Sequence, residues 1–178
     1  MQKYKTQFEV GIYGGRICTP VSVLVACQFL LGRSLTVETV HECMRVAHKL
    51  YEERFSMGAE ALPMLEDVLP VLPSEEYASV FVAGPLQDTD DVPQAVEGLL
   101  LRPWLSLLSG LQQDPPARTA AVLTKRGHTR CFLFDPTAQA LVFDSGDGTL
   151  RPLDLKRESG LVGEFSGVLL TLRAQKRK

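Results

Sequence analysis

The sequence is apolar at nearly every position from 21 to 31, and this run constrains the fold more than any other feature. A helix that is apolar on all sides belongs in the core of a globular protein. Pro20, just before the run, is tolerated only in the first turn of a helix, and Gly32, just after it, is typical of a helix end. The sequence therefore predicts a buried helix over 18–31, with Cys18 at its N-terminus.

The composition favours a single globular domain over 1–178. The chain has 178 residues, 45% of them hydrophobic, and a formal net charge of −2, so it can bury a sizeable core. The near-neutral charge gives no electrostatic reason to bind nucleic acid. The N-terminus lacks the apolar stretch of a signal peptide, and the run over 18–31 is too short to cross a membrane. We expect a monomeric intracellular protein of the cytoplasm, or also of the nucleus, without nucleic-acid or membrane partners.

Helices are expected mainly in the first part of the chain and strands in the last. A helix over 37–54, capped by Ser34 or Thr36, has apolar residues at helical spacing: Val37, Val40, Met44, Ala47 and Tyr51. A short helix is expected over 59–69 and a longer one over 92–111. The longer helix would bury Trp104, and Pro103 would kink or split it. Strands are expected over 77–82, 120–124, 130–134, 141–144 and 167–172. Short turns would make the later strands antiparallel neighbours, so the order of elements predicts the α+β class.

Cys18 is the residue whose position points most clearly to chemistry. At the N-terminus of a buried helix, unpaired backbone N–H groups and the positive end of the helix dipole favour a thiolate. A histidine and an aspartate follow late in the chain, because Gly127-His128 precedes the strand over 130–134 and Asp144 ends the strand over 141–144. A thiol nucleophile needs a base and a group that orients the base, and these residues can supply both.

A cysteine that opens the central helix, a Gly-His before one strand and a Phe-Asp-Ser at the end of the next resemble the papain-like cysteine peptidases. Within that superfamily the chain looks most like small intracellular deubiquitinases, namely the Josephin and ovarian-tumour domains. The stretches 121–124 and 141–145 are also similar to those of herpesvirus tegument deubiquitinases. The resemblance implies a papain-like fold, in which the helix that carries the nucleophile packs on a small C-terminal antiparallel sheet.

The resemblance also implies a role for each matching residue. Cys18 would be the nucleophile, His128 the general base and Asp144 the residue that orients the imidazole, while the backbone N–H of Cys18 would donate to the oxyanion. The substrate would be a bond after the C-terminal glycine of ubiquitin or a ubiquitin-like modifier. Gly14 and Gly15 on one side and Gly127 on the other would form a narrow cleft for a tail without side chains. The segment 54–91 would contact the body of the modifier.

Two features depart from the family patterns. Papain-like enzymes often have a glutamine five or six positions before the nucleophile, where this chain has Tyr13 and Ile12. Gln7, eleven positions upstream, could replace that oxyanion donor only if the intervening loop folds back. The tegument proteases place a histidine two residues after the aspartate, and this chain has Gly146 there.

Asp135 competes with Asp144 for the third role, because it also ends a strand. On one extended strand, Asp135 would lie about 23 Å from His128. A hairpin centred on Pro136 would instead pair Phe134 with Ala138 and would place Asp144 directly opposite His128. Strand geometry therefore favours Asp144 without any appeal to a family.

Other chemistries find less support in the sequence. The four cysteines include no Cys-x-x-Cys pair, so neither a zinc site nor a disulfide framework is expected, and Cys27 and Cys131 fit the core. His41 and His48 are seven residues apart, about 10 Å along a helix, which is too far for one zinc ion. We expect them at the surface. No phosphate-binding loop is present in the sequence, and we expect neither a metal nor another cofactor.

Two alternatives to a deubiquitinase remain open. The chain could be a non-catalytic binding module on the same fold, which the missing family glutamine favours. It could also be a papain-like amidase or transferase with another substrate, because a fold and a triad do not determine the substrate.

Overall fold

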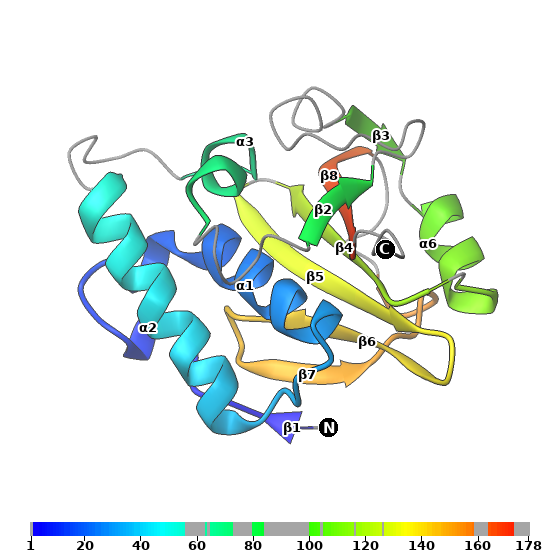
Figure 1. Cartoon of the computed structure of the whole chain (residues 1–178), viewed down its shortest axis with the longest axis horizontal. Coiled ribbons are helices and arrows are strands. Elements are labelled where there is room, and N and C mark those ends of the chain that lie inside the picture. Colours follow the sequence, from blue (N-terminus) through cyan, green and yellow to red (C-terminus); the bar gives the residue numbers. More distant parts are fainter. Residues whose placement is uncertain are drawn as a thin grey trace, which may run out of the picture.

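An antiparallel sheet of eight strands organises the part of the chain that this computed structural model describes, residues 2–55, 63, 65–72, 80–83, 100–103, 105–115, 117–125, 127–158 and 164–172. The strands are β1 (Gln2–Lys3), β2 (Val80–Ala83), β3 (Leu100–Pro103), β4 (Thr119–Lys125), β5 (His128–Asp135), β6 (Ala138–Asp144), β7 (Thr149–Pro152) and β8 (Glu164–Leu172). Their order is β1-β7-β6-β5-β4-β8-β2, and β3 also pairs with β8. Strands β4 to β7 thus form a meander, to which β8 adds at the outer edge of β4 (Figure 1).

The helix predicted over 18–31 is present as α1 (Cys18–Leu30), and every one of its residues is buried. It packs on β5 and β4 on one side and on α2 on the other, so that it runs through the core (Figure 1). Gly32 ends it with a φ of 76°, while its N–H donates to the Phe29 carbonyl and the Arg33 N–H donates to the Gln28 carbonyl. Such a pair of bonds around a left-handed residue stops a helix sharply.

Helix α2 (Val37–Arg54) has the predicted bounds and covers α1. Thr36, one of the two predicted caps, accepts a hydrogen bond from the Thr39 N–H at 3.1 Å. The buried face is formed by Val40, Cys43, Met44, Ala47 and Tyr51. Val37, the first residue of the helix, is exposed, contrary to the expected stripe. Short 3₁₀ helices η1 (Gln7–Glu9) and η2 (Gly14–Arg16) precede α1.

The opposite face of the sheet is also covered. Helix α6 (Leu105–Gln113) places Leu108 against Ala121, Phe132 and neighbouring apolar residues, which form a second core cluster. The helix predicted over 92–111 is therefore wrong over 100–103, which is strand β3 paired with β8. Pro103 has no N–H and prevents a helix from continuing through it, so α6 begins only after it. Residues 92–99 and Trp104 lie outside the described residues.

The remaining predicted elements are found in part. Strands β4, β5, β6 and β8 confirm the four late strands, and β2 confirms the end of the strand over 77–82. The short helix expected over 59–69 is present as α3 (Leu65–Val68), followed by η3 (Leu69–Val71). The rest of both segments lies outside the described residues, apart from Pro63. The fold class is α+β, as predicted.

The predicted register of the β5–β6 hairpin is wrong. Asp135 pairs with Ala138 across a two-residue turn, whereas Leu133 pairs with Leu141 and Cys131 with Phe143. Between these pairs β6 contains one residue more than β5, which is a β-bulge. The Asp135 carboxylate closes the turn by accepting from the Thr137 N–H at 2.9 Å. The register beyond the bulge puts Gly146 opposite His128, so Asp144 reaches His128 diagonally.

The N-terminal segment lies against the end of the β6–β7 hairpin. Strand β1 pairs with β7, the Tyr4 N–H donates to the Gly148 carbonyl at 2.8 Å, and the Gln7 N–H donates to the Ser145 carbonyl at 2.9 Å. Residues 4–7 are thereby fixed beside the end of β6. Among the described residues, no helix combines the length and apolar composition that crossing a membrane requires.

We expect Gly148→Ala to destabilise the protein. Gly148 has a φ of 66°, and a Cβ there would lie 2.5 Å from the Tyr4 carbonyl oxygen, so the free energy of unfolding should fall by roughly 2 kcal/mol. Gly110→Ala is the matched control, because a Cβ in this exposed turn of α6 meets no atom within 4 Å. That change should raise stability by up to about 1 kcal/mol. Urea unfolding measures both, and an equal effect of the two substitutions would contradict the tight contact at Gly148.

Candidate active site

Cys18 opens α1 and is 5% exposed. Its Sγ lies 3.5 Å from the carbonyl oxygen of Gly127, in the turn between β4 and β5, and can donate a hydrogen bond to it. The preceding residue, Ile17, has no side-chain acceptor for the N–H groups of the first turn. The thiol therefore lies at the positive end of a buried helix, as the sequence predicts.

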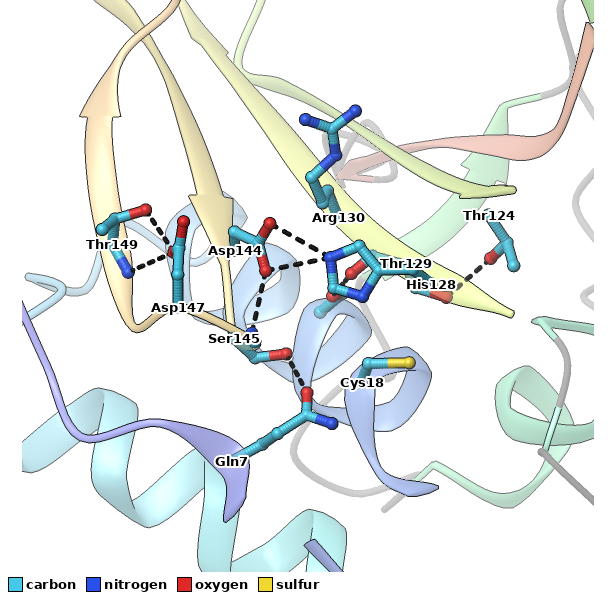
Figure 2. A network of polar contacts seen from close by, with 12 residues as sticks. Gln7, Cys18, Thr124, His128, Thr129, Arg130, Asp144, Ser145, Asp147 and Thr149 are labelled. Atoms are coloured by element: carbon cyan, nitrogen blue, oxygen red, sulfur yellow. Dashed lines mark hydrogen bonds and ion pairs between the residues drawn. The ribbon is translucent and has the colours of Figure 1, made fainter. Parts of the chain in front are cut away.

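His128, the first residue of β5, is held by Asp144 at the end of β6 (Figure 2). Its Nε2 is 3.0 Å from each carboxylate oxygen of Asp144. The Gly146 N–H donates to Asp144 Oδ1 at 2.8 Å and so fixes the carboxylate in turn. Because Asp144 occupies Nε2, the other ring nitrogen is left on the side of Cys18, as Figure 2 shows. The structure thus brings the three predicted residues together from three separate elements.

The charges of the three groups support one another. The hydrogen bond to Asp144, followed by that to Cys18, raises the pKa of His128 to about 10. Burial raises the pKa of the Cys18 thiol, but the bonds from His128 and from the Thr129 N–H outweigh it, and the net pKa is lowered. Asp144 behaves likewise: burial raises its pKa, His128 lowers it, and the net value lies below the ordinary one. These directions favour a thiolate next to an imidazolium.

The bond to Gly127 and the lowered pKa describe two protonation states of Cys18. A protonated thiol can donate to the Gly127 carbonyl, which is the observed contact. A thiolate has no proton to donate, and the His128 ring and the Thr129 N–H are the groups that stabilise it.

Gln7 lies beside the site because the intervening loop folds back. Its side chain is 3% exposed, and its Oε1 accepts a hydrogen bond from the Ser145 hydroxyl at 2.6 Å. Figure 2 shows the amide nitrogen of Gln7 directed toward the side on which Cys18 lies. The loop between Gln7 and Cys18 therefore folds back, as the predicted role of Gln7 requires. Its role as an oxyanion donor stays a prediction.

The three predicted cleft glycines differ in their surroundings. Gly14 is buried, and a Cβ there would lie 2.5 Å from the Gln7 carbonyl oxygen, so glycine is required for the loop to fold back. Gly15 and Gly127 are exposed, and Gly127 has a φ of 75°. Gly14 thus has a structural task in the loop, and the substrate cleft itself stays a prediction.

A buried hydroxyl network next to the site was not predicted. Thr129 Oγ1 lies 2.7 Å from Thr19 Oγ1 and 2.7 Å from Thr124 Oγ1, while the Ser22 hydroxyl donates to the Thr129 carbonyl at 3.2 Å. Thr19 follows Cys18 and Thr129 follows His128, so the network joins the segments that carry thiol and base. Thr19 and Ser22, two polar residues near the start of a largely apolar helix, were the signal available in the sequence. Nothing in the sequence marked Ser145 as the partner of Gln7.

The competing candidates are engaged elsewhere. Asp135 accepts from Arg118 Nε at 3.1 Å and from Thr137, at the far end of β5. His48 Nε2 accepts from the Tyr13 N–H at 3.2 Å, so this histidine is half-buried against the N-terminal loop, contrary to the expected surface position. His41 is likewise half-buried. Within the described ranges, no three histidine, cysteine or acidic side chains are grouped as metal ligands would be.

The other thiols are enclosed in the core. Cys27 and Cys131 are fully buried, as expected, and burial raises the pKa of Cys131 far above its ordinary value.

No protein-family model and no curated protein matches the sequence. The chemistry proposed below rests on the residues of the site and on the resemblance of their order to papain-like peptidases.

The pH dependence of alkylation tests the ion pair. A lowered pKa means that the thiolate accumulates at lower pH, so the reaction of Cys18 with iodoacetamide should reach half its maximal rate below pH 9.0, the ordinary pKa of the thiol. In His128→Ala, burial still raises the pKa of the Cys18 thiol, but the hydrogen bond from His128 that lowers this pKa is lost. The pH midpoint should therefore rise above that of the wild type. Peptide mass spectrometry assigns the label to Cys18. An identical midpoint in both proteins would rule out the pairing of Cys18 with His128.

Proposed function

We propose that the protein is a papain-like cysteine peptidase that cleaves isopeptide or peptide bonds after the C-terminal glycine of ubiquitin or a ubiquitin-like modifier. The observation that carries the proposal is the position of His128, whose Nε2 lies 3.0 Å from both Asp144 oxygens while its other ring nitrogen lies on the side of Cys18 (Figure 2). A histidine held between a carboxylate and a thiol at a helix N-terminus is the arrangement that thiol catalysis uses.

Each of the three groups has a step in the proposed cleavage of the amide bond. The Cys18 thiolate attacks the carbonyl carbon, a C–S bond forms, and the carbonyl electron pair moves to the oxygen. His128, as imidazolium, gives its proton to the departing amine as the C–N bond breaks and a thioester remains. The neutral imidazole then takes a proton from water, whose oxygen attacks the thioester, and the thiolate leaves. Asp144 keeps the ring oriented and stabilises its charged form throughout.

Two donors are available for the negative oxygen that forms during attack. The backbone N–H of Cys18 is one, because it belongs to the first turn of α1 and points out of the helix N-terminus. The side-chain amide of Gln7 is the other. A donor at this place is worth on the order of 10²–10³-fold in kcat.

The resemblance and the glycines beside the site support the proposed substrate class. Gly15 and Gly127 are exposed and carry no side chain, which suits the narrow Gly-Gly tail of a modifier. The segment 54–91, where we expect contact with the modifier body, lies largely outside the described residues. The proposed setting is the cytoplasm, or also the nucleus, and the proposed protein is a monomer without a metal or other cofactor.

The alternatives make different demands on the site. A non-catalytic binding module needs neither a lowered thiol pKa nor a carboxylate on His128, and both are present. A papain-like amidase or transferase would use the same three residues, so only the substrate distinguishes it from a deubiquitinase.

Electrophilic probes test nucleophile and substrate together. Ubiquitin and ubiquitin-like proteins with a C-terminal electrophile should form a covalent adduct with the wild type, no adduct with Cys18→Ala and a slower one with His128→Ala, as measured by intact mass. Cys131→Ala is the matched control and should react like the wild type. If no modifier probe reacts while iodoacetamide still labels Cys18 selectively, the ubiquitin assignment is wrong and the amidase or transferase alternative holds. If both reagents fail, the binding module holds.

The two aspartates should differ in their effect on turnover. Asp144→Ala removes the charge and the acceptor that hold His128, and kcat should fall by roughly 10²-fold or more. Asp135→Ala loses the contacts with Arg118 and Thr137 at the other end of the hairpin, so it should lower stability by about 1 kcal/mol and leave kcat unchanged. Steady-state hydrolysis and urea unfolding separate the effects. Equal losses of kcat would refute the assignment of Asp144.

A further inference from the structure

Ser145 holds the oxygen of the Gln7 side-chain amide by a hydrogen bond. The Ser145 side chain is fully buried, and its hydroxyl donates to Gln7 Oε1 at 2.6 Å. The backbones are joined as well, since the Gln7 N–H donates to the Ser145 carbonyl at 2.9 Å. Main chain and side chain of Gln7 are therefore fixed by the same residue. Because a carboxamide is planar, fixing its oxygen also fixes the direction of its NH₂ group.

The fixed orientation matters for the reaction. With Oε1 held by Ser145, the NH₂ group of Gln7 is the end left on the side of Cys18 (Figure 2). The reverse orientation would present a carbonyl oxygen to the thiolate and to the forming oxyanion, and like charges repel. Without the Ser145 hydroxyl, nothing in the observed contacts distinguishes the two ends of the amide.

Ser145 also lies between two residues that position the base. Asp144 holds His128, and the Gly146 N–H holds Asp144 at 2.8 Å. A Cβ on Gly146 would lie 3.1 Å from His128 Cε1, so glycine leaves room for the ring. Three consecutive residues at the end of β6 thus place both the base and Gln7.

We propose that Ser145 is a positioning residue that sets the amide of Gln7 for oxyanion binding and links the oxyanion donor to the strand end that carries Asp144. This inference rests on the proposed function and adds a residue to its machinery. Ser145 touches neither the substrate nor the thiol in this role, and it acts through Gln7. Its effect should therefore appear only in reactions that create an oxyanion, and only while Gln7 is present.

Two reactions of Cys18 distinguish an effect on oxyanion binding from a general effect on the thiol. Hydrolysis of ubiquitin with a fluorescent aminocoumarin in amide linkage at its C-terminus creates an oxyanion. Alkylation by iodoacetamide proceeds by displacement at carbon and creates none. Ser145→Ala should lower kcat for hydrolysis about 10-fold, less than the 10²–10³-fold expected of Gln7→Ala. The alkylation rate and its pH midpoint should equal those of the wild type.

The double variant Gln7→Ala/Ser145→Ala provides the sharper readout. If Ser145 acts through Gln7, its removal has no further effect on kcat in the Gln7→Ala background. Thr119→Val is the matched control, since it removes another buried hydroxyl, one that donates to the Ala117 carbonyl at the far end of β4. It should leave kcat unchanged. Ser145→Cys keeps a weak donor of similar size and serves if Ser145→Ala does not fold. Its kcat is expected to lie between that of the wild type and the roughly 10-fold lower value expected of Ser145→Ala.

Several results would overturn the inference. An unchanged kcat in Ser145→Ala, an equal loss with and without Gln7, or a parallel loss of alkylation would each show that Ser145 has no role in orienting Gln7. The proposed function fails separately: hydrolysis would then persist in Cys18→Ala or be missing in the wild type, and the inference would fall with it. Cys18-dependent hydrolysis that Ser145→Ala leaves intact overturns the inference alone.

Discussion

The hydroxyl of Thr129 is the contact on which the geometry of the site depends. It bonds to Thr19 on α1 and to Thr124 on β4, inside a largely apolar core. Thr19 follows Cys18 in the sequence and Thr129 follows His128, so the short bond between Thr19 and Thr129 sets the spacing of the thiol and the imidazole. Burial strengthens such bonds and makes their loss costly, because the freed hydroxyls would have no water. Helix and sheet thus meet through polar contacts beside the site.

Around that contact the site is assembled from four separate parts of the chain: the N-terminal loop, α1, β5 and the end of β6. Burial disfavours the charged forms of Cys18 and Asp144, and the shared imidazolium of His128 reverses both effects. The charge pattern therefore exists only in the folded chain. Since the N-terminal loop is pinned to Ser145 and Gly148, even the most distant contributor belongs to the same rigid frame.

Much of this frame could be predicted from local pattern. The apolar run, Pro20 and Gly32 gave α1 almost to the residue, and the stripe from Val40 to Tyr51 gave α2. Contacts between distant residues were less accessible. That Gln7 lies beside the site depends on how Gly14 packs beneath it, and the strand at 100–103 exists because β8 pairs with it. The hairpin register failed because one extra residue in β6 leaves no mark in composition or periodicity.

That extra residue has a consequence for the chemistry. If the pairing of Asp135 with Ala138 continued unbroken along the hairpin, Ser145 would face His128, and Asp144 would lie opposite Thr129 on the face of the sheet that α1 covers. The bulge moves β6 by one position and exchanges the two faces. The length of β6 and the bulge that absorbs its extra residue must therefore match for Asp144 to reach His128. One further residue inserted there without a second bulge, far from the thiol, would leave all three proposed catalytic side chains in the sequence and separate them in space.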